Sequence, residues 1–235
     1  KDITDISVYA KFQLQDETDT FLLAWTTTPW TLPGNVALAV NPKVDYVEVV
    51  VDGKKYILAK ERLSVLKEQK YEVVKGLKGS ELVGKKYKPL FDYYVNENLT
   101  HKDHAWKVYG ADFVTTEDGT GIVHIAPAFG ADDLALSRRE HLPLIHHVGT
   151  DGKFKKEVLD FALQSVKTKE DHQKADIEII KNLAHRGMLF AKEKIVHSYP
   201  HCWRCETPLL NYAASSWFVK VTEIKDKIVA ENKKV

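Results

Sequence analysis

The chain has 235 residues, of which 44% are hydrophobic and 10% aromatic, so it can bury the core of one large domain. Lys and Arg total 34 against 33 for Asp and Glu, and this balance excludes binding of a polyanion by bulk charge, so any nucleic-acid contact should be local. No apolar run approaches the roughly 18 residues of a membrane helix, and no signal peptide is evident, so we expect no membrane association and a cytoplasmic location.

Two details of the sequence bear on its origin. The chain begins at Lys1 and its only methionine is Met188, so we interpret it as a fragment of a longer protein. Its only cysteines, Cys202 and Cys205, are separated by two residues, a spacing that suits metal or redox chemistry better than a disulfide. This cysteine usage also favours the cytosol.

The first third of the chain has the alternation of apolar and polar residues that is typical of β-strands. We predict strands from Val8 to Leu14 and from Phe21 to Thr28, the second stopped by Pro29. Asp52-Gly53 favours a tight hairpin turn between two further strands. The elements predicted from the hairpin onward are strands at Tyr46–Val51 and Lys54–Ala59, a short helix at Glu61–Gln69, and strands at Glu72–Val74 and Tyr87–Tyr94.

The rest of the chain mixes strands with separated helices. We predict a strand pair, Trp106–Thr115 and Ile122–Ile125, joined by turn residues. The remaining predictions are helices from Asp132 to about His141 and over Lys174–Arg186, strands at Met188–Ser198 and Trp217–Val221, and a polar helix from Glu223. Many strands with few helices indicate an α+β fold, with a closed or nearly closed mixed β-barrel core and peripheral helices.

Several common catalytic motifs are absent from the sequence. Neither phosphate-binding glycine motif is present, and there is no GxSxG elbow around a serine nucleophile. If the protein is an enzyme, water is therefore the attacking group, and the protein contributes positioning and electrostatics.

The first candidate site is the polar segment where the second predicted strand ends, with Thr26, Thr27, Thr28, Trp30 and Asn35. Alternation along a strand puts Thr26 and Thr28 on one face and Thr27 on the other. A threonine run alone can be ordinary β-branched strand sequence. The tryptophan and asparagine that follow favour the rim of a pocket instead.

The second candidate site runs from His124 to Asp133. His124 ends an apolar strand, where a histidine can simply be a satisfied core residue. Asp132 and Asp133 can both be explained as the N-cap and first-turn acid of the helix that follows. Only one carboxylate is needed for a cap, however. If Asp132 caps the helix, Asp133 is free to bind an ammonium group, and the positive helix end would keep it ionised.

The third candidate is HSYPHCWRC, from His197 to Cys205. One CxxC pair supplies half of the four ligands of a structural zinc site. His197 or His201 could complete the set, but we favour a second CxxC outside the fragment. Two cysteines with no metal role remain an alternative.

Together, in this order and spacing, WTTTPWTLPGN (25–35) and GTGIVHIAPAFGADD (119–133) resemble the editing domain, or connective peptide, of the class I aminoacyl-tRNA synthetases for isoleucine, valine and leucine. TTTPWT is similar to the isoleucine type, because the other two types typically carry an arginine and an acidic residue where Thr28 and Trp30 stand here. AFGADD (128–133) also resembles the isoleucine type rather than HDPND or HDERD. SYPHCWRC, with the later TPL and SWF, resembles the segment that returns to the catalytic core.

The resemblance implies a hydrolase that removes valine from isoleucine tRNA without a covalent intermediate. It implies that Asp133 anchors the α-ammonium of the substrate and that His124 and Trp30 wall the side-chain pocket. Thr26, Thr27, Thr28 and Asn35 would hold the terminal adenosine, the ester and the attacking water, and Thr26, Thr27, Thr28 and Asp133 form the catalytic set. Further substrate-binding residues would be Phe129, Gly130, Asp132 and Tyr199.

The same resemblance sets the expected organisation, cofactor and partners. Residues 1–200 would form the editing domain, and 201–235 the CxxC-containing return segment. We expect no cofactor for editing, and zinc at Cys202 and Cys205 only if cysteines outside the fragment complete the site. The expected partners are the acceptor end of isoleucine tRNA, valine as valyl-tRNA or valyl-adenylate, and the rest of the synthetase in cis, with the protein a monomer.

Two other interpretations stay open from the sequence. A non-catalytic RNA-binding or zinc-ribbon module would account for the CxxC pair, the aromatic residues and the lysine clusters. An editing domain of the valine or leucine type would clear other amino acids, although TTTPWT argues against it.

Overall fold

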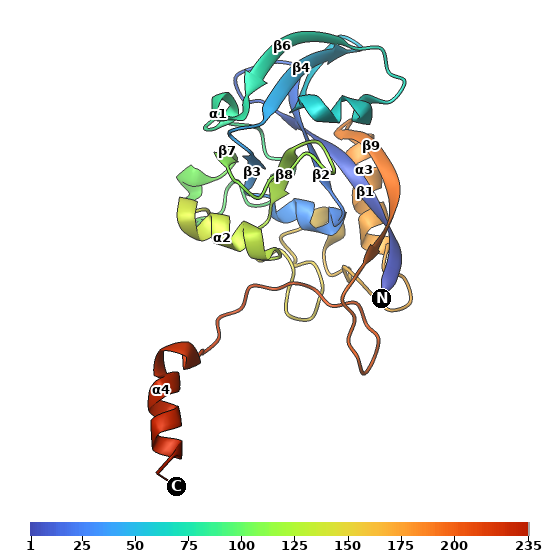
Figure 1. Cartoon of the computed structure of the whole chain (residues 1–235). Coiled ribbons are helices and arrows are strands. Elements are labelled where there is room, and N and C mark those ends of the chain that lie inside the picture. The colour runs from blue at the N-terminus through green and yellow to red at the C-terminus, as the bar shows by residue number, and fades with distance from the viewer. Residues whose placement is uncertain (235) are drawn as a thin grey trace.

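The computed structural model describes residues 1–234 and is built around one mixed sheet (Figure 1). Its strands are β1 (Asp2–Gln13), β2 (Thr20–Thr26), β3 (Ala37–Val40), β4 (Asp45–Val51), β5 (Lys54–Ala59), β6 (Glu72–Lys78), β7 (Lys107–Gly110), β8 (Ile122–Ile125) and β9 (Leu189–Ser198). Its α-helices are α1 (Gly79–Leu82), α2 (Ala131–Glu140), α3 (Lys174–His185) and α4 (Val221–Asn232), and its short 3₁₀ helices are η1 (Pro29–Gly34), η2 (Lys60–Leu66), η3 (Lys102–His104) and η4 (Leu159–Phe161).

The strands curl into a nearly closed barrel. Their order is β6-β4-β5-β2-β8-β3-β7, and β1 pairs with both β2 and β9. The segment 85–88 bridges β7 and β1. The Lys85 carbonyl accepts the N–H of Val108 in β7 at 2.9 Å, and the Lys88 N–H donates to the carbonyl of Gln13 in β1 at 2.8 Å. The α+β prediction with a nearly closed mixed barrel is confirmed.

Apolar side chains fill the barrel and explain its closure. The alternating residues of β1 and β2 place Phe12 and Leu22 inside, where they are fully buried with Leu38 of β3. A second buried cluster, around Val49, Leu58 and Leu66, seals the β4–β5 hairpin against η2. The hairpin is as predicted, and Gly53 takes the positive φ of 76° that its tight turn requires.

The pairing of β2 with β8 brings the threonine motif and the histidine motif together. β2 and β8 run parallel, with Trp25 opposite Val123. Because parallel strands end at the same edge of a sheet, the segments that follow β2 and β8 leave the barrel side by side. These are the segments that contain Thr26–Thr28 and Ala126–Asp133.

Several predicted elements are corrected by the structure. The predicted strand Tyr87–Tyr94 is reduced to isolated bridges at Lys86 and Tyr87, because Pro89 lacks the N–H that a ladder needs. The strand predicted at 122–125 is β8, and that predicted at 106–115 is shortened to β7, but their predicted pairing is wrong: β3, a short buried strand without alternation, lies between β7 and β8. The strand predicted at 217–221 does not form, because no neighbouring strand pairs with it.

The helices agree more closely with the sequence pattern. α3 ends at His185 and Gly187 follows with φ 68°, as the C-terminal stop requires. The helix predicted at 61–69 is the 3₁₀ helix η2, kinked at Arg62. α4 stands away from the body at the end of an extended connection (Figure 1), and none of its residues is buried.

Candidate functional site

The two motifs converge on one pocket of about 190 Å³ at the edge where β2 and β8 end. Six predicted site residues line it, namely Thr26, Thr28, His124, Phe129, Gly130 and Asp133, together with Trp25, Thr31, Val123 and Ala126. The volume is below the roughly 300–1,000 Å³ of pockets for drug-sized ligands, so a group the size of an amino-acid side chain suits it.

Threonine hydroxyls form a connected polar edge of this pocket. β2 ends at Thr26, earlier than predicted, and Thr28 precedes η1. The Oγ1 atoms of Thr26 and Thr28 lie 3.3 Å apart, as do those of Thr28 and Thr31. The Thr28 N–H donates to Thr26 Oγ1 at 3.1 Å, and Thr31 Oγ1 donates to the Thr28 carbonyl at 2.8 Å. The short turn into η1 therefore gathers three hydroxyls at one place.

His124 is held by hydrogen bonds to both ring nitrogens. Asn35 Nδ2 can only donate, so Nδ1 of His124 accepts from it at 3.3 Å. Nε2 therefore carries the proton and donates to Thr31 Oγ1 at 2.8 Å. The Tyr87 hydroxyl completes the chain by donating to Asn35 Oδ1 at 2.7 Å. This assignment fixes one tautomer and one orientation of the ring.

The burial and hydrogen bonds of His124 make it a poor general base. Burial, with a smaller contribution from nearby His147, lowers its pKa to about 3. The imidazole is thus neutral at pH 7, and its one acceptor nitrogen is already occupied by Asn35. His124 can shape the pocket and orient Thr31, but it cannot readily accept a proton from water.

Asp133 presents a carboxylate to the pocket from the first turn of α2. Its Oδ2 accepts the Ala126 N–H at 2.7 Å. Burial raises its pKa to about 6, although the hydrogen bond from the Ala126 N–H opposes this rise. The sequence predicts that the positive helix end determines the ionisation of Asp133, but burial has the larger effect on its pKa. The helix begins after Gly130, and neither Asp132 nor Asp133 makes a capping hydrogen bond. The carboxylate is largely ionised at pH 7 and poised to bind a cation.

Phe129 forms the apolar wall, with further rings behind it. Its ring centroid lies 4.7 Å from His147 and 5.2 Å from Trp30, both in edge-to-face geometry. Trp30, expected to wall the pocket, is only 2% exposed and does not line it, whereas Phe129 does. Burial lowers the pKa of His147 to about 4, which keeps this layer uncharged at neutral pH.

Four more predicted site residues lie outside the pocket. Asn35 is buried behind His124 and positions it rather than lining the cavity. Thr27, the first residue after β2, does not line the pocket. Asp132 is exposed on the outer side of α2. Tyr199 lines a different pocket, after β9.

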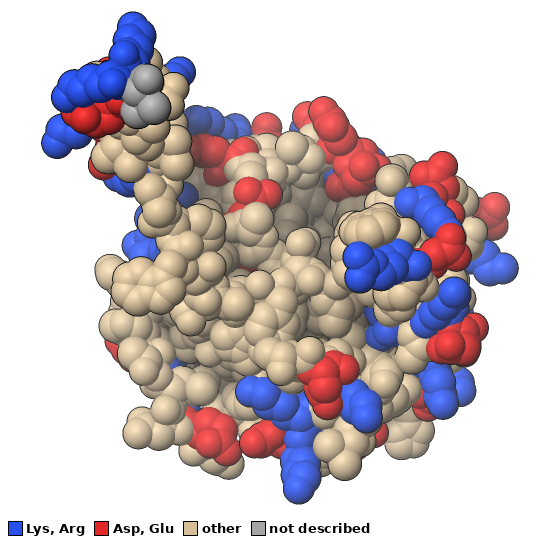
Figure 2. Space-filling view, turned by 90° about the horizontal axis from the view of Figure 1, so that it is seen from below, with Lys and Arg blue, Asp and Glu red and all other residues tan. Residues whose placement is uncertain are grey.

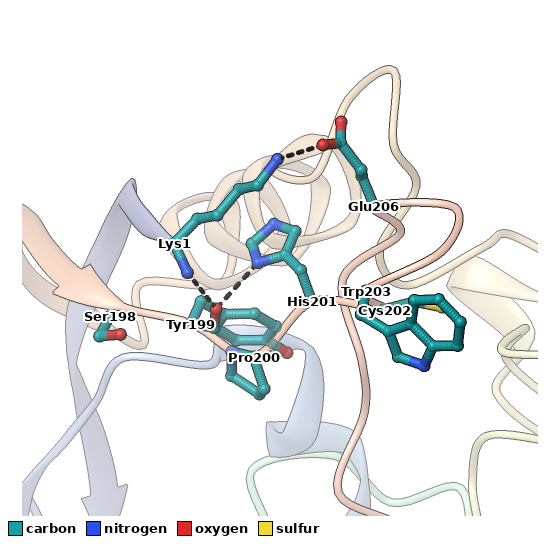
Figure 3. A pocket seen from close by; sticks show the side chains of 8 residues that line it. All are labelled: Lys1, Ser198, Tyr199, Pro200, His201, Cys202, Trp203 and Glu206. Carbon is teal, nitrogen blue, oxygen red and sulfur yellow. Dashed lines mark hydrogen bonds and ion pairs between the residues drawn. The ribbon is translucent and has the colours of Figure 1, made fainter.

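The pocket that contains Tyr199 is shown in Figure 3 and has a volume of about 420 Å³. Lys1 and Glu206 pair across it at 2.7 Å, and His201 Nδ1 donates to the Tyr199 carbonyl at 2.8 Å. The Tyr199 ring lies under Lys167, with 5.4 Å from Nζ to the ring centroid. Tyr199 is connected to the first site through the buried charge of Lys167.

A network of buried charges links Tyr199 to η1. Lys167 Nζ contacts Asp5 Oδ1 at 3.1 Å and Asp176 Oδ2 at 3.0 Å, and all three side chains are essentially inaccessible to solvent. Asp176 Oδ1 in turn accepts the Trp30 N–H at 2.9 Å. The network ties the first residues of η1, and hence Thr31, to β1 and α3.

Cys202 and Cys205 form one tight turn. Cys202 donates its N–H to the Thr207 carbonyl, and Glu206 donates to that of Cys202, each at 2.9 Å. Hydrogen bonding with Thr207 and Cys202 lowers the pKa of Cys205 to about 7. Within residues 1–234 no third ligand joins the pair in a group that could hold a metal. The donor set fits half of a tetrahedral zinc site.

Sequence reasoning missed several residues of this site. Thr31 could have been found, because the fourth threonine of TTTPWT stands three residues after Thr28 in a turn. Trp25, Val123 and Ala126 line the pocket only because β2 and β8 are neighbours. The sequence around Tyr87 and around His147 gives no indication of the roles of these two residues.

Two further observations concern the charge on the surface and the character of the helices. Seen from below, the centre of the face is made of uncharged residues, and charged side chains gather around its rim (Figure 2). Within residues 1–234, no helix has the length and apolar character needed to cross a bilayer.

Comparison with known proteins assigns the chain to a family. Isoleucine–tRNA ligases from Clostridium acetobutylicum and Clostridium novyi are 48% and 46% identical to it over all 235 residues, and that of Bacillus thuringiensis (strain Al Hakam) is 43% identical over the same length. The chain is homologous to a segment of isoleucine–tRNA ligases. It spans 22% of the length of each of these relatives. No family model matches it.

A solved structure shows the same fold. The crystal structure of GlLeuRS-CP1 superposes with a TM-score of 0.57 at 15% identity, covering 83% of this chain and 100% of that one. The isoleucine–tRNA ligase segment therefore has the fold of this CP1 domain.

Proposed function

We propose that the chain is the editing domain of an isoleucine–tRNA ligase and that it hydrolyses valine wrongly attached to isoleucine tRNA. The observation that carries the proposal is the single small pocket in which the Asp133 carboxylate, the threonine hydroxyls and the His124 ring come together. The homology of the whole chain to a segment of isoleucine–tRNA ligases supports it.

The need for such a pocket is energetic. Valine is one methylene smaller than isoleucine, and a synthetic site that accepts isoleucine cannot exclude it strongly. For isoleucyl-tRNA synthetases themselves, the known example of this limit, discrimination is only about 150-fold. A second pocket that admits valine and rejects isoleucine corrects the error. The pocket of about 190 Å³, walled by Phe129 and His124, has suitable size and lining.

Each residue has a defined task in this proposal. The Asp133 carboxylate binds the α-ammonium of the misattached valine. His124 and Phe129 limit the length of its side chain. The hydroxyls of Thr26, Thr28 and Thr31 hold the ester and the attacking water by hydrogen bonds, and Thr27 lies beside them toward the terminal adenosine.

The reaction is a hydrolysis by direct attack of water. Water attacks the ester carbonyl carbon, the bond to the ribose oxygen breaks, and the proton lost by water passes to that oxygen. Free valine and a free tRNA end result. His124 is not the base, since its pKa is about 3, so the threonine hydroxyls and the neighbouring ribose hydroxyl carry out the positioning. Once the ammonium is bound, its charge lowers the pKa of Asp133 and keeps it ionised.

The setting of the domain is part of the proposal. The chain acts in the cytoplasm, in a monomeric synthetase, with the rest of the enzyme in cis. It contacts the acceptor end of isoleucine tRNA locally, since its net charge is only +1. Misactivated valyl-adenylate is a second substrate of the same pocket.

Editing needs no cofactor in this scheme. A zinc ion held by Cys202 and Cys205 would need two ligands from outside residues 1–234, and it would fix the turn that begins the return segment. Zinc analysis tests this: the full-length ligase should retain about one zinc that Cys202→Ser removes. The isolated chain, with only two thiols, should lose zinc on dialysis.

The decisive test of the proposed function is Asp133→Asn in the full-length ligase. This change keeps the shape and removes the charge. It should lower kcat/KM for valyl-tRNA hydrolysis about 10²-fold or more, because removing one partner of a desolvated ion pair costs about 2–5 kcal/mol. Aminoacylation should be unchanged. Asp112→Asn, at an exposed carboxylate that follows β7 and does not line the pocket, is the matched control. Wild-type deacylation by Asp133→Asn would reject the assignment.

His124→Ala tests the size gate separately. Removing the ring should let isoleucyl-tRNA enter the pocket and be hydrolysed, so that correctly charged tRNA is lost. Deacylation of isoleucyl-tRNA and valyl-tRNA would be measured side by side. If isoleucyl-tRNA stays fully protected, His124 does not set the limit.

A further inference from the structure

The Phe129 wall is supported from two directions. The buried His147 and Trp30, the latter a member of the barrel core, pack on one side. Tyr212 and His146 also pack against it, with ring centroids 5.8 and 6.4 Å from that of Phe129. Tyr212 belongs to the extended connection that follows the CxxC turn, far along the chain from the pocket motifs.

The connection is held beside Phe129 by three hydrogen bonds. Ala213 donates its N–H to the Ala128 carbonyl at 2.8 Å, next to Phe129. The Ala213 carbonyl accepts a hydrogen bond from His146 Nε2 at 2.7 Å. The Tyr212 hydroxyl donates to the Val148 carbonyl at 3.3 Å. These contacts hold the Tyr212 ring half-buried, with the His146 ring tilted against it at a centroid distance of 5.0 Å.

We propose that Tyr212, held by His146, is a specificity-determining positioning residue that keeps Phe129 in place and thereby sets the upper size limit of the pocket. The inference rests on the proposed editing function. Tyr212 does not line the pocket and acts only through Phe129. A cavity in place of its ring would let Phe129 move back, and the pocket would gain the room that one more methylene needs.

This arrangement makes the return segment a part of the size gate. Residues 211–213 of the extended connection lie against the loop before α2, so the wall depends on a segment outside both pocket motifs. His124 closes the pocket from β8, and Phe129 with Tyr212 closes it from the loop before α2. The two gates are separate because no ring contact joins His124 to Tyr212.

The test compares Tyr212→Ala with Tyr212→Phe in the full-length ligase, by measuring kcat and KM for hydrolysis of valyl-tRNA and isoleucyl-tRNA. Tyr212→Ala should raise kcat/KM for isoleucyl-tRNA about tenfold or more, within the ~10–200-fold known for one methylene from isoleucyl-tRNA synthetases themselves. Valyl-tRNA should keep its kcat. Tyr212→Phe, which retains the ring, should restore protection of isoleucyl-tRNA. Tyr71→Ala, at an exposed tyrosine before β6, is the control.

Unchanged protection of isoleucyl-tRNA in Tyr212→Ala would overturn the inference, and so would an equal fall in both activities, since that indicates only a damaged fold. Failure of the wild-type ligase to hydrolyse valyl-tRNA would instead reject the editing function. In that case NMR of labelled Phe129 still decides the structural part. Tyr212→Ala should speed the ring flips of Phe129 and shift its resonances. Unchanged signals would contradict the claim that Tyr212 holds Phe129 in place.

Discussion

A β-carbon added at Gly130 would lie 2.8 Å from Cγ of Asp133 and 2.9 Å from its Oδ1. Such contacts are closer than packed carbon and oxygen atoms tolerate. The φ of Gly130 is −140°, which any residue can adopt, so glycine is required here for space and not for backbone freedom. The absence of a side chain at Gly130 is what lets the Asp133 carboxylate fold back to the Ala126 N–H.

Gly130→Ala should therefore displace the Asp133 carboxylate without unfolding the domain. We expect KM for valyl-tRNA hydrolysis to rise about tenfold, equivalent to about 1.4 kcal/mol of binding, while the melting temperature changes little. Gly76→Ala is the matched control, because a β-carbon at Gly76 meets no atom within 4 Å. Identical KM values for the two variants would show that Asp133 does not need this space.

His124 should remain neutral well into the acid range. Its pKa falls from 6.5 to about 3 on folding, so its contribution to stability is complete above pH 6.5 and is lost as the pH falls toward 3. Over that range each pH unit removes about 1.4 kcal/mol of the free energy of unfolding. Urea titrations of the wild type and His124→Gln should therefore converge as the solution is acidified. An NMR signal of His124 that titrates near pH 6.5 would contradict this.

Tyr87→Phe should weaken the site from behind. It removes the donor to Asn35 Oδ1 and leaves that buried oxygen without its partner, at a cost of about 1–3 kcal/mol. Because Asn35 orients His124, protection of isoleucyl-tRNA should also decline. Tyr109→Phe is the comparison, since the Tyr109 hydroxyl donates to the His104 carbonyl at a partly exposed position away from the pocket. Chemical denaturation measures the loss of stability, and deacylation assays measure the protection of isoleucyl-tRNA. Equal losses in the Tyr87 and Tyr109 variants would argue against a role for the hydrogen-bonded chain from Tyr87 through Asn35 to His124.

Lys167→Met should be strongly destabilising, by about 3–5 kcal/mol, because it leaves Asp5 and Asp176 buried without their cation. Burial raises the pKa of Asp176 to about 6 and Lys167 opposes that rise, so removal of Lys167 should raise the pKa further and penalise the ionised carboxylate. A carboxyl whose pKa is higher in the folded than in the unfolded state contributes less to the free energy of unfolding as the pH rises through its folded-state pKa. The loss should thus be larger at pH 8 than at pH 5 in urea unfolding. Lys181→Met, which breaks an exposed pair with Glu178, should change stability by only about 0.5 kcal/mol.

Local patterns in the sequence were sufficient for the elements that depend on near neighbours. The β4–β5 hairpin follows from Asp52-Gly53, and α3 follows from its apolar spacing and from Gly187. The strand predicted at 217–221 failed for the opposite reason. A strand exists only where a second strand pairs with it, and composition alone does not supply that partner.

For the site, the sequence by itself determined which residue types are present and which segments carry them: the threonine run, His124, and the glycine and aspartate before α2. Only the tertiary structure decided which of them share a pocket. The parallel pairing of β2 with β8 brings Thr26 and Asp133 to one edge, the relay through Asn35 and Tyr87 sets the His124 tautomer, and Phe129 replaces Trp30 at the wall. These outcomes depend on contacts between residues up to about a hundred positions apart, and a linear pattern encodes spacing along the chain rather than distance in space.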